Sequence, residues 1–192
     1  MDQAATLREI KKTGKGTLLE RDIRPLSPRD VRVISVTSGK GGVGKTNVAA
    51  NLACLLAKQK KKTLVLDADA GLANIDVILG INSRYNLFHM LSGEKTLKDI
   101  LIDGPGGIRI LPSASGIPEM TDLSRGQKLT LIDELTVLGD SLNFMIIDTG
   151  AGISSNVMYF NMAAKEIIVV TTPEPTAMTD AYALIKVLYQ RH

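Results

Sequence analysis

Short apolar runs, rich in β-branched residues, alternate along the chain with segments that have helical periodicity. The apolar runs are residues 31–36, 64–66, 108–111, 144–147 and 167–170. Helical periodicity covers residues 46–58, 125–138 and 176–189. The runs are continuous rather than alternately apolar and polar, which indicates strands that are buried on both faces of a sheet.

This alternation predicts a doubly wound α/β domain, in which a mostly parallel sheet has helices on both faces. The periodicity that predicts the first helix passes through Val48, Leu52, Leu55 and Leu56. The last helical segment runs to the end of the chain without a C-cap or a following strand. A crossover helix normally returns the chain to the sheet, so we expect the domain to be C-terminally incomplete.

The chain changes character near residue 30. Residues 1–30 contain several glycines and prolines and no sustained apolar pattern, which predicts a short helix over about residues 3–12 followed by a flexible connector. Residues 31–192 form the predicted domain. Residues 1–32 carry eight Lys or Arg and five Asp or Glu, so the other residues hold 15 of each sign and are electrically balanced.

The composition excludes several classes of protein. A single cysteine, Cys54, rules out a disulfide framework and points to a reducing compartment, and its helical apolar surroundings predict a core position. His89 and His192 are isolated and lack the spacing of a metal site. We see no secretory signal and no apolar run of transmembrane length.

A glycine-rich loop follows the first predicted strand. Residues 39–46, GKGGVGKT, fit the P-loop pattern, with a strand before and a helix after. Backbone N–H groups of such a loop cradle phosphate oxygens, and Lys45 neutralises phosphate charge. The expected nucleotide contacts in this segment are Gly39, Gly41, Gly42, Val43, Gly44, Lys45, Thr46 and Asn47.

Lys40 is a second lysine for which an ordinary P-loop has no role. With it, the loop resembles the deviant Walker A motif of the MinD/ParA group of ATPases, which belong to the SIMIBI class of P-loop NTPases. The resemblance implies that Lys40 reaches across a homodimer to the ATP held by the facing subunit. Lys40, Lys45 and Asp69 are the catalytic residues that the motifs and this resemblance predict.

Carboxylates follow two of the predicted strands. Asp148 ends an apolar strand, as in a Walker B motif, and is expected to hold Mg²⁺ together with the Thr46 hydroxyl. Asp67 and Asp69 follow another strand. The resemblance implies that Asp69 positions the attacking water, and we expect Asp67 to support the Mg²⁺ shell or the loop. The resemblance also places Pro173 and Glu174 near the nucleotide base and ribose.

Several segments resemble the flagellar ATPase family of FlhG and FleN. They are residues 2–8 (DQAATLR), 67–76, 104–115, 148–153 and 179–186. The resemblance implies a cytoplasmic ATPase that controls flagellar number and placement, and associates with the inner face of the cell membrane as an ATP-bound dimer. No membrane-binding helix of the family is visible in this sequence.

The same resemblance implies partners. The N-terminal element would stimulate an FlhF-type GTPase through Asp2, Gln3, Ala4, Leu7 and Arg8. Flagellar C-ring proteins and a flagellar transcription regulator are further candidate partners.

Rival functions remain open on the sequence. A ParA-type ATPase that partitions DNA would need a basic face, which the balanced charge of the domain disfavours, so no specific nucleic acid is expected. A metal-cluster ATPase would need more cysteines than Cys54. A non-enzymatic scaffold, in which the P-loop serves only nucleotide-dependent binding, is the alternative from another class.

Overall fold

The computed structural model describes residues 31–69, 75–113, 117, 120, 122–139 and 141–191. The predicted N-terminal helix and connector lie outside these residues. The described strands are β1 (Arg32–Ser38), β2 (Thr63–Ala68), β3 (Ile102–Asp103), β4 (Arg109–Leu111), β5 (Phe144–Ala151) and β6 (Glu166–Val169). They form one sheet in the order β3-β4-β2-β5-β1-β6, and only β3 runs antiparallel to its neighbour.

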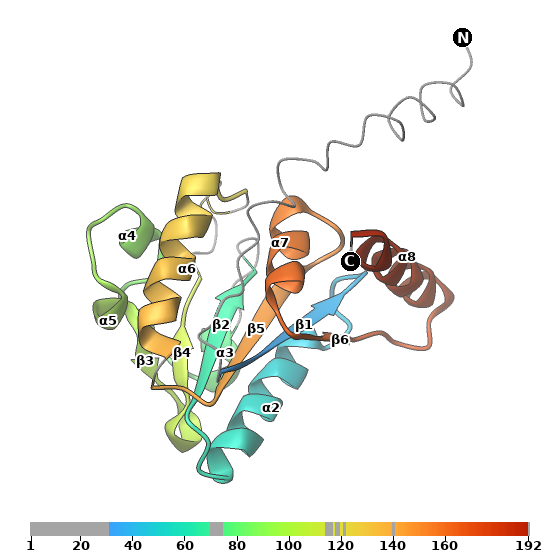
Figure 1. The fold of residues 1–192 in the computed structure, drawn as a ribbon. Coiled ribbons are helices and arrows are strands. Elements are labelled where there is room, and N and C mark those ends of the chain that lie inside the picture. The colour runs from blue at the N-terminus through green and yellow to red at the C-terminus, as the bar shows by residue number, and fades with distance from the viewer. Residues whose placement is uncertain are drawn as a thin grey trace.

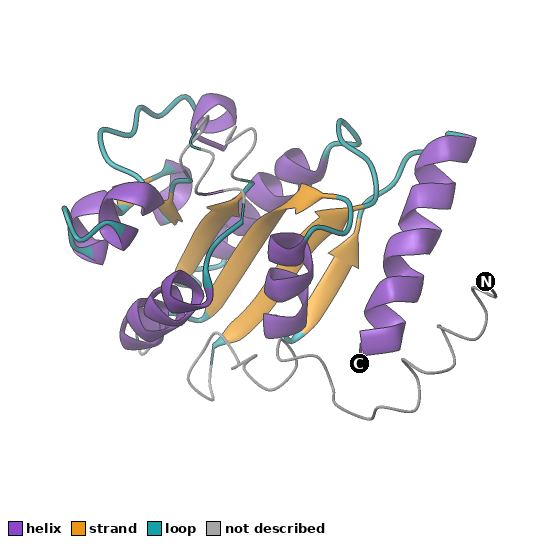
Figure 2. Ribbon diagram, turned by 90° about the horizontal axis from the view of Figure 1, so that it is seen from above, coloured by secondary structure: helices purple, strands orange, loops and turns teal. Residues whose placement is uncertain are grey.

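Helices cover both faces of this sheet (Figure 2). They are α2 (Lys45–Lys58), α3 (Ile75–Leu79), α4 (Leu87–Leu91), α5 (Leu97–Ile100), the 3₁₀ turn η1 (Pro105–Gly107), α6 (Arg125–Gly139), α7 (Ser155–Ala163) and α8 (Pro175–Arg191). Figure 1 shows α8 beside β6 at one end of the sheet and α4 and α5 near β3 at the other. The predicted doubly wound, mostly parallel α/β fold is confirmed.

Alternation of side chains along the central strands explains their continuous apolar runs. On β5, Met145 and Ile147 pack with α4, α5, α6 and α7 on one face, whereas Ile146 packs with α2 and α3 on the other. Successive side chains of a strand point to opposite faces, so a strand between two helical layers is apolar at every position.

Helix α2 buries its alanines more fully than the apolar stripe that predicted it, of which Leu52 and Leu56 are partly buried against the core. Ala49, Ala50 and Ala53 are buried against the sheet, while Leu55 is 56% exposed and Val48 38% exposed. α2 contacts β1, β2 and β5. Small side chains allow a helix to approach a sheet this closely, so the residues with the smallest side chains occupy the contact face. Cys54 is partly buried beside the same core.

Candidate functional site

The strand order brings distant segments of the chain to one edge of the sheet. β5 lies between β1 and β2, so the carboxyl ends of these three parallel strands are adjacent. Asp67 on β2 and Asp148 on β5 are paired in register. Ligands of open α/β sheets bind at this edge, where the strand order reverses.

The loop between β1 and α2 has the backbone of an anion site. Gly42 and Gly44 have φ angles of 78° and 93°, in the left-handed region that side-chain-bearing residues rarely adopt. Gly44 is the N-cap of α2 and contributes no side-chain cap, and the first turn of the helix carries no acidic residue. The N–H groups at this helix start are therefore available to a phosphate.

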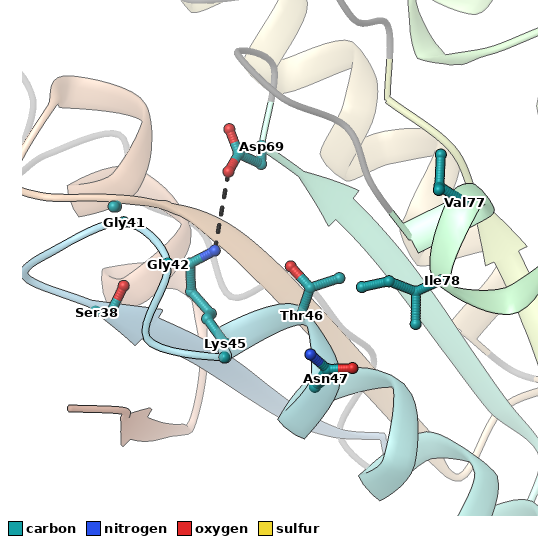
Figure 3. A pocket seen from close by; sticks show the side chains of 11 residues that line it. Ser38, Gly41, Gly42, Lys45, Thr46, Asn47, Asp69, Val77 and Ile78 are labelled. Carbon is teal, nitrogen blue, oxygen red and sulfur yellow. Dashed lines mark ion pairs between the residues drawn. The ribbon is translucent and has the colours of Figure 1, made fainter. Parts of the chain in front are cut away.

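A pocket of about 340 Å³ opens beside this loop (Figure 3). Its lining combines P-loop backbone, polar side chains from the start of α2 and from the ends of β1 and β2, and an apolar wall from α3. The lining residues are Ser38, Gly41, Gly42, Gly44, Lys45, Thr46, Asn47, Asp69, Val77, Ile78 and Ala151. A polar cradle with an apolar wall suits a phosphate-bearing ligand that also has an apolar part.

The Lys45 ammonium lies between two of the carboxylates predicted for the site. Its Nζ lies 3.5 Å from Asp148 Oδ1 and 3.8 Å from Asp69 Oδ2, and its side chain is almost fully buried. Figure 3 shows the ammonium directed toward Asp69. A cation held between two carboxylates beside a phosphate cradle can neutralise charge on a bound phosphate group.

Asp148 and Asp67 are both 1% exposed, and burial raises the pKa of each carboxyl. For Asp148, Lys45 and a hydrogen bond from Thr46 oppose that rise. For Asp67, burial raises the pKa from 3.8 to about 7. Asp67 Oδ1 accepts the backbone N–H of Asp69 at 3.0 Å, whereas Oδ2 has no hydrogen-bond partner among the described residues.

The oxygen donors of this corner fit Mg²⁺. Asp148, the Thr46 hydroxyl and the unpartnered Oδ2 of Asp67 are hard ligands of the kind that Mg²⁺ prefers. Within the described ranges no group of three or more His, Cys, Asp or Glu is placed to hold a metal without other ligands. Mg²⁺ is usually held by one or two carboxylates together with nucleotide phosphates, so this donor set is sufficient.

Lys40 and Glu174 contact each other and are not among the residues that line the pocket, although Lys40 precedes the lining residue Gly41. Lys40 Nζ donates to Glu174 Oε2 and to Thr176 Oγ1, each at 3.0 Å. Pro173, which precedes Glu174, is exposed and also outside the lining. The roles predicted for Pro173 and Glu174 near the base and ribose therefore remain predictions, and the contact with Lys40 was not foreseen.

Several pocket residues were not found from the sequence. Ser38 and Ala151 are strand-end positions that line the pocket, and they become partners only after the register of β1 and β5 shifts between Val36 and Ser38. Val77 and Ile78 come from α3, a five-residue helix too short to have a clear periodicity. The predicted partner residues, Asp2, Gln3, Ala4, Leu7 and Arg8, lie outside the described residues.

This fold and this loop define the class of the protein: an α/β domain with a P-loop nucleotide site. In the part of the chain that the structure describes, no helix has both the length and the apolar character needed to span a membrane. The family described as AAA domain matches residues 31–191. The chain belongs to this family, as a P-loop ATPase of the MinD/ParA type related to FlhG and FleN.

Similar proteins include flagellar and cell-division proteins. Antiactivator FleN of Pseudomonas aeruginosa is 48% identical over 166 residues, which are 86% of this chain and 59% of FleN. Flagellum site-determining protein YlxH of Helicobacter pylori is 44% identical, over 82% of this chain and 54% of YlxH. The chain thus spans little more than half the length of these relatives.

Among solved structures, the fold matches septum site-determining protein MinD of Pyrococcus horikoshii, complexed with Mg-ADP. The TM-score is 0.72 and the identity 31%, over 83% of this chain and 65% of that one.

Proposed function

We propose that this chain is an ATP-hydrolysing switch that pairs with a second copy of itself when ATP and Mg²⁺ are bound, and that it controls flagellar number and placement. The observation that carries the ATPase proposal is that Lys45, which lines the P-loop pocket, is held between Asp69 and Asp148. The similarity to FleN and YlxH supports the flagellar role, and the similarity to MinD with Mg-ADP supports the nucleotide and metal.

The proposed reaction is ATP and water to ADP and phosphate. The P-loop N–H groups and Lys45 bind the phosphates and neutralise their charge. Asp69, which lines the pocket and is the less buried of the two Lys45 partners, orients the attacking water and accepts its proton. Asp148, Thr46 and Asp67 would hold Mg²⁺, which would supply positive charge to offset the negative charge of the phosphates.

Pairing of two copies explains the second lysine of the loop. The Lys40 ammonium contacts Glu174 and Thr176, and Lys40 is not among the residues that line the pocket of its own chain. Placed against a second copy, it would supply a cation to the neighbour's triphosphate, as an arginine finger does. The ATP of each subunit would then form part of the surface that its partner recognises.

The remaining parts of the proposal concern location and partners. The ATP-bound dimer works in the cytoplasm, at the inner face of the cell membrane, as the resemblance to FlhG implies. Residues 2–8 stimulate an FlhF-type GTPase, and flagellar C-ring proteins or a flagellar transcription regulator are further partners. Adding the purified chain to such a GTPase, with Gln3→Ala as the variant, tests this part; equal stimulation by both would contradict it.

Concentration-dependent hydrolysis tests the core of the proposal. We expect specific activity to rise with protein concentration, because the site is complete only in the dimer. Lys40→Ala should bind ATP and lose the dimer, and Asp69→Asn should keep the dimer and lose at least about 100-fold in turnover. Asp103→Asn, an exposed carboxylate on β3, is the control. Activity that is independent of concentration, or a stable Lys40→Ala dimer in light scattering, would refute the paired site.

A further inference from the structure

The Lys40 ammonium is already occupied within its own chain. Two of its three N–H donors are used by Glu174 Oε2 and Thr176 Oγ1, at 3.0 Å each. Glu174 immediately precedes α8 and Thr176 lies in its first turn. The lysine that the proposed dimer needs in the partner's site is therefore held against α8 of its own subunit.

Backbone packing places Lys40 beside the start of α8. A Cβ added at Gly39 would lie 2.2 Å from the carbonyl carbon of Asp180 and 2.6 Å from the backbone nitrogen of Ala181. The start of the P-loop and the second turn of α8 are thus in direct backbone contact. Lys40 follows Gly39, so its side chain starts beside the beginning of α8, within reach of Glu174.

From this geometry we infer that Glu174 and Thr176 hold Lys40 in a withdrawn position and set the threshold for ATP-dependent pairing. The inference rests on the proposed function. Lys40 cannot donate the same N–H groups to Glu174 and to a triphosphate on the facing subunit. The triphosphate carries several negative charges against the one of Glu174, so ATP competes successfully for Lys40, whereas ADP, which lacks the γ-phosphate, competes poorly.

The ion pair between Lys40 and Glu174 is weak enough to shift the dimerisation equilibrium without preventing dimerisation. The side chains of Lys40 and Glu174 are 40% and 63% exposed. An exposed ion pair changes an equilibrium by a factor of about 1.5 to 5. A dimer must break two such pairs, one in each subunit, so removing them should tighten pairing by about 2- to 25-fold.

Glu174→Gln tests the inference, with Glu166→Gln as its matched control. Glu166 also forms an exposed ion pair, with Arg32, but on β6 and β1 away from the P-loop. The dimer dissociation constant is measured by analytical ultracentrifugation with Mg²⁺ and a non-hydrolysable ATP analogue, and again with ADP. We expect Glu174→Gln to lower it by about 2- to 25-fold, Glu174→Asp to restore most of the wild-type value, and Glu166→Gln to leave it unchanged.

A variant of the other Lys40 partner separates positioning of Lys40 from any other role of Glu174. Thr176→Val removes the second acceptor of the Lys40 ammonium, so it should also tighten pairing if both residues act by holding Lys40, whereas pairing equal to that of the wild type would contradict the role assigned to Thr176. Nucleotide affinity of the monomer, followed with a fluorescent ADP, should be the same for wild type and Glu174→Gln. A loss of that affinity would overturn the inference and favour a base or ribose contact for Glu174.

The dimer measurements also distinguish failure of the inference from failure of the proposed function. If the wild type pairs with the ATP analogue and Glu174→Gln pairs equally or more weakly, the inference is wrong and the proposed function stands. If the wild type does not pair at any concentration of analogue, the dimerisation switch itself is refuted, and the inference with it.

Discussion

Asp67→Asn should make the nucleotide-free protein more stable at high pH. The Asp67 carboxyl is 1% exposed, and its Oδ2 has no hydrogen-bond partner among the described residues. Burial raises its pKa from 3.8 to about 7. Asparagine has nearly the same shape, keeps an oxygen for the backbone N–H of Asp69, and is neutral at every pH.

The sign and the size of the effect follow from proton linkage. A carboxyl with a raised pKa binds its proton more tightly in the folded chain than in the unfolded chain. Its contribution to stability is fully present below pH 3.8 and is lost as the pH rises to about 7. A tenfold change in proton affinity corresponds to about 1.4 kcal/mol, so the complete loss is about 4 kcal/mol in the wild type and zero in Asp67→Asn.

Urea unfolding at pH 4.5 and pH 8, without nucleotide or Mg²⁺, measures this loss. Between these values the free energy of unfolding of Asp67→Asn should rise by about 3 kcal/mol relative to the wild type. Asp103→Asn removes an exposed carboxylate and should show no comparable change. If the difference between Asp67→Asn and wild type is the same at both pH values, the buried carboxyl does not retain its proton in the folded protein and the reasoning fails.

Two further predictions concern buried contacts. Gly39→Ala should lower the free energy of unfolding by about 2–3 kcal/mol or more, because the added Cβ would overlap the α8 backbone. Gly41→Ala is the control, since a Cβ added there has no atom within 4 Å and should change stability in urea little. Equal losses in the two variants would contradict this. Asn161→Leu should cost about 2–4 kcal/mol, since the Asn161 amide pairs with the buried Ser35 and Thr37 hydroxyls; a loss below about 1 kcal/mol would show that those hydroxyls find other partners.

Much of the sheet could be predicted because its signal is local. Each central strand is apolar at successive positions, as in the Met145–Ile147 segment, and this pattern arises whenever helices cover both faces. The sequence gives no comparable signal for β3, which has two residues, or for α3, α4 and α5, which have four or five each. Such short elements depend on tertiary contacts rather than on their own periodicity.

Periodicity predicted the buried face of α2 only in part. Large residues such as Leu55 predicted the helix correctly, but Ala49 and Ala53 form the contact with the sheet. Which stripe of a helix is buried depends on how close the opposing surface is, and that distance comes from the packing of the whole domain. Likewise, the contact between Lys40 and Glu174 depends on the position of α8 beside the P-loop.

The sequence by itself determined the local chemistry: a glycine-rich loop able to bind phosphate, and carboxylates at the ends of apolar strands. Only the tertiary structure decided which of these groups meet, because β5 lies between β1 and β2 and so places Lys45 between Asp69 and Asp148. Strand pairing joins residues about 100 positions apart in the chain, and no local pattern encodes that choice of neighbour.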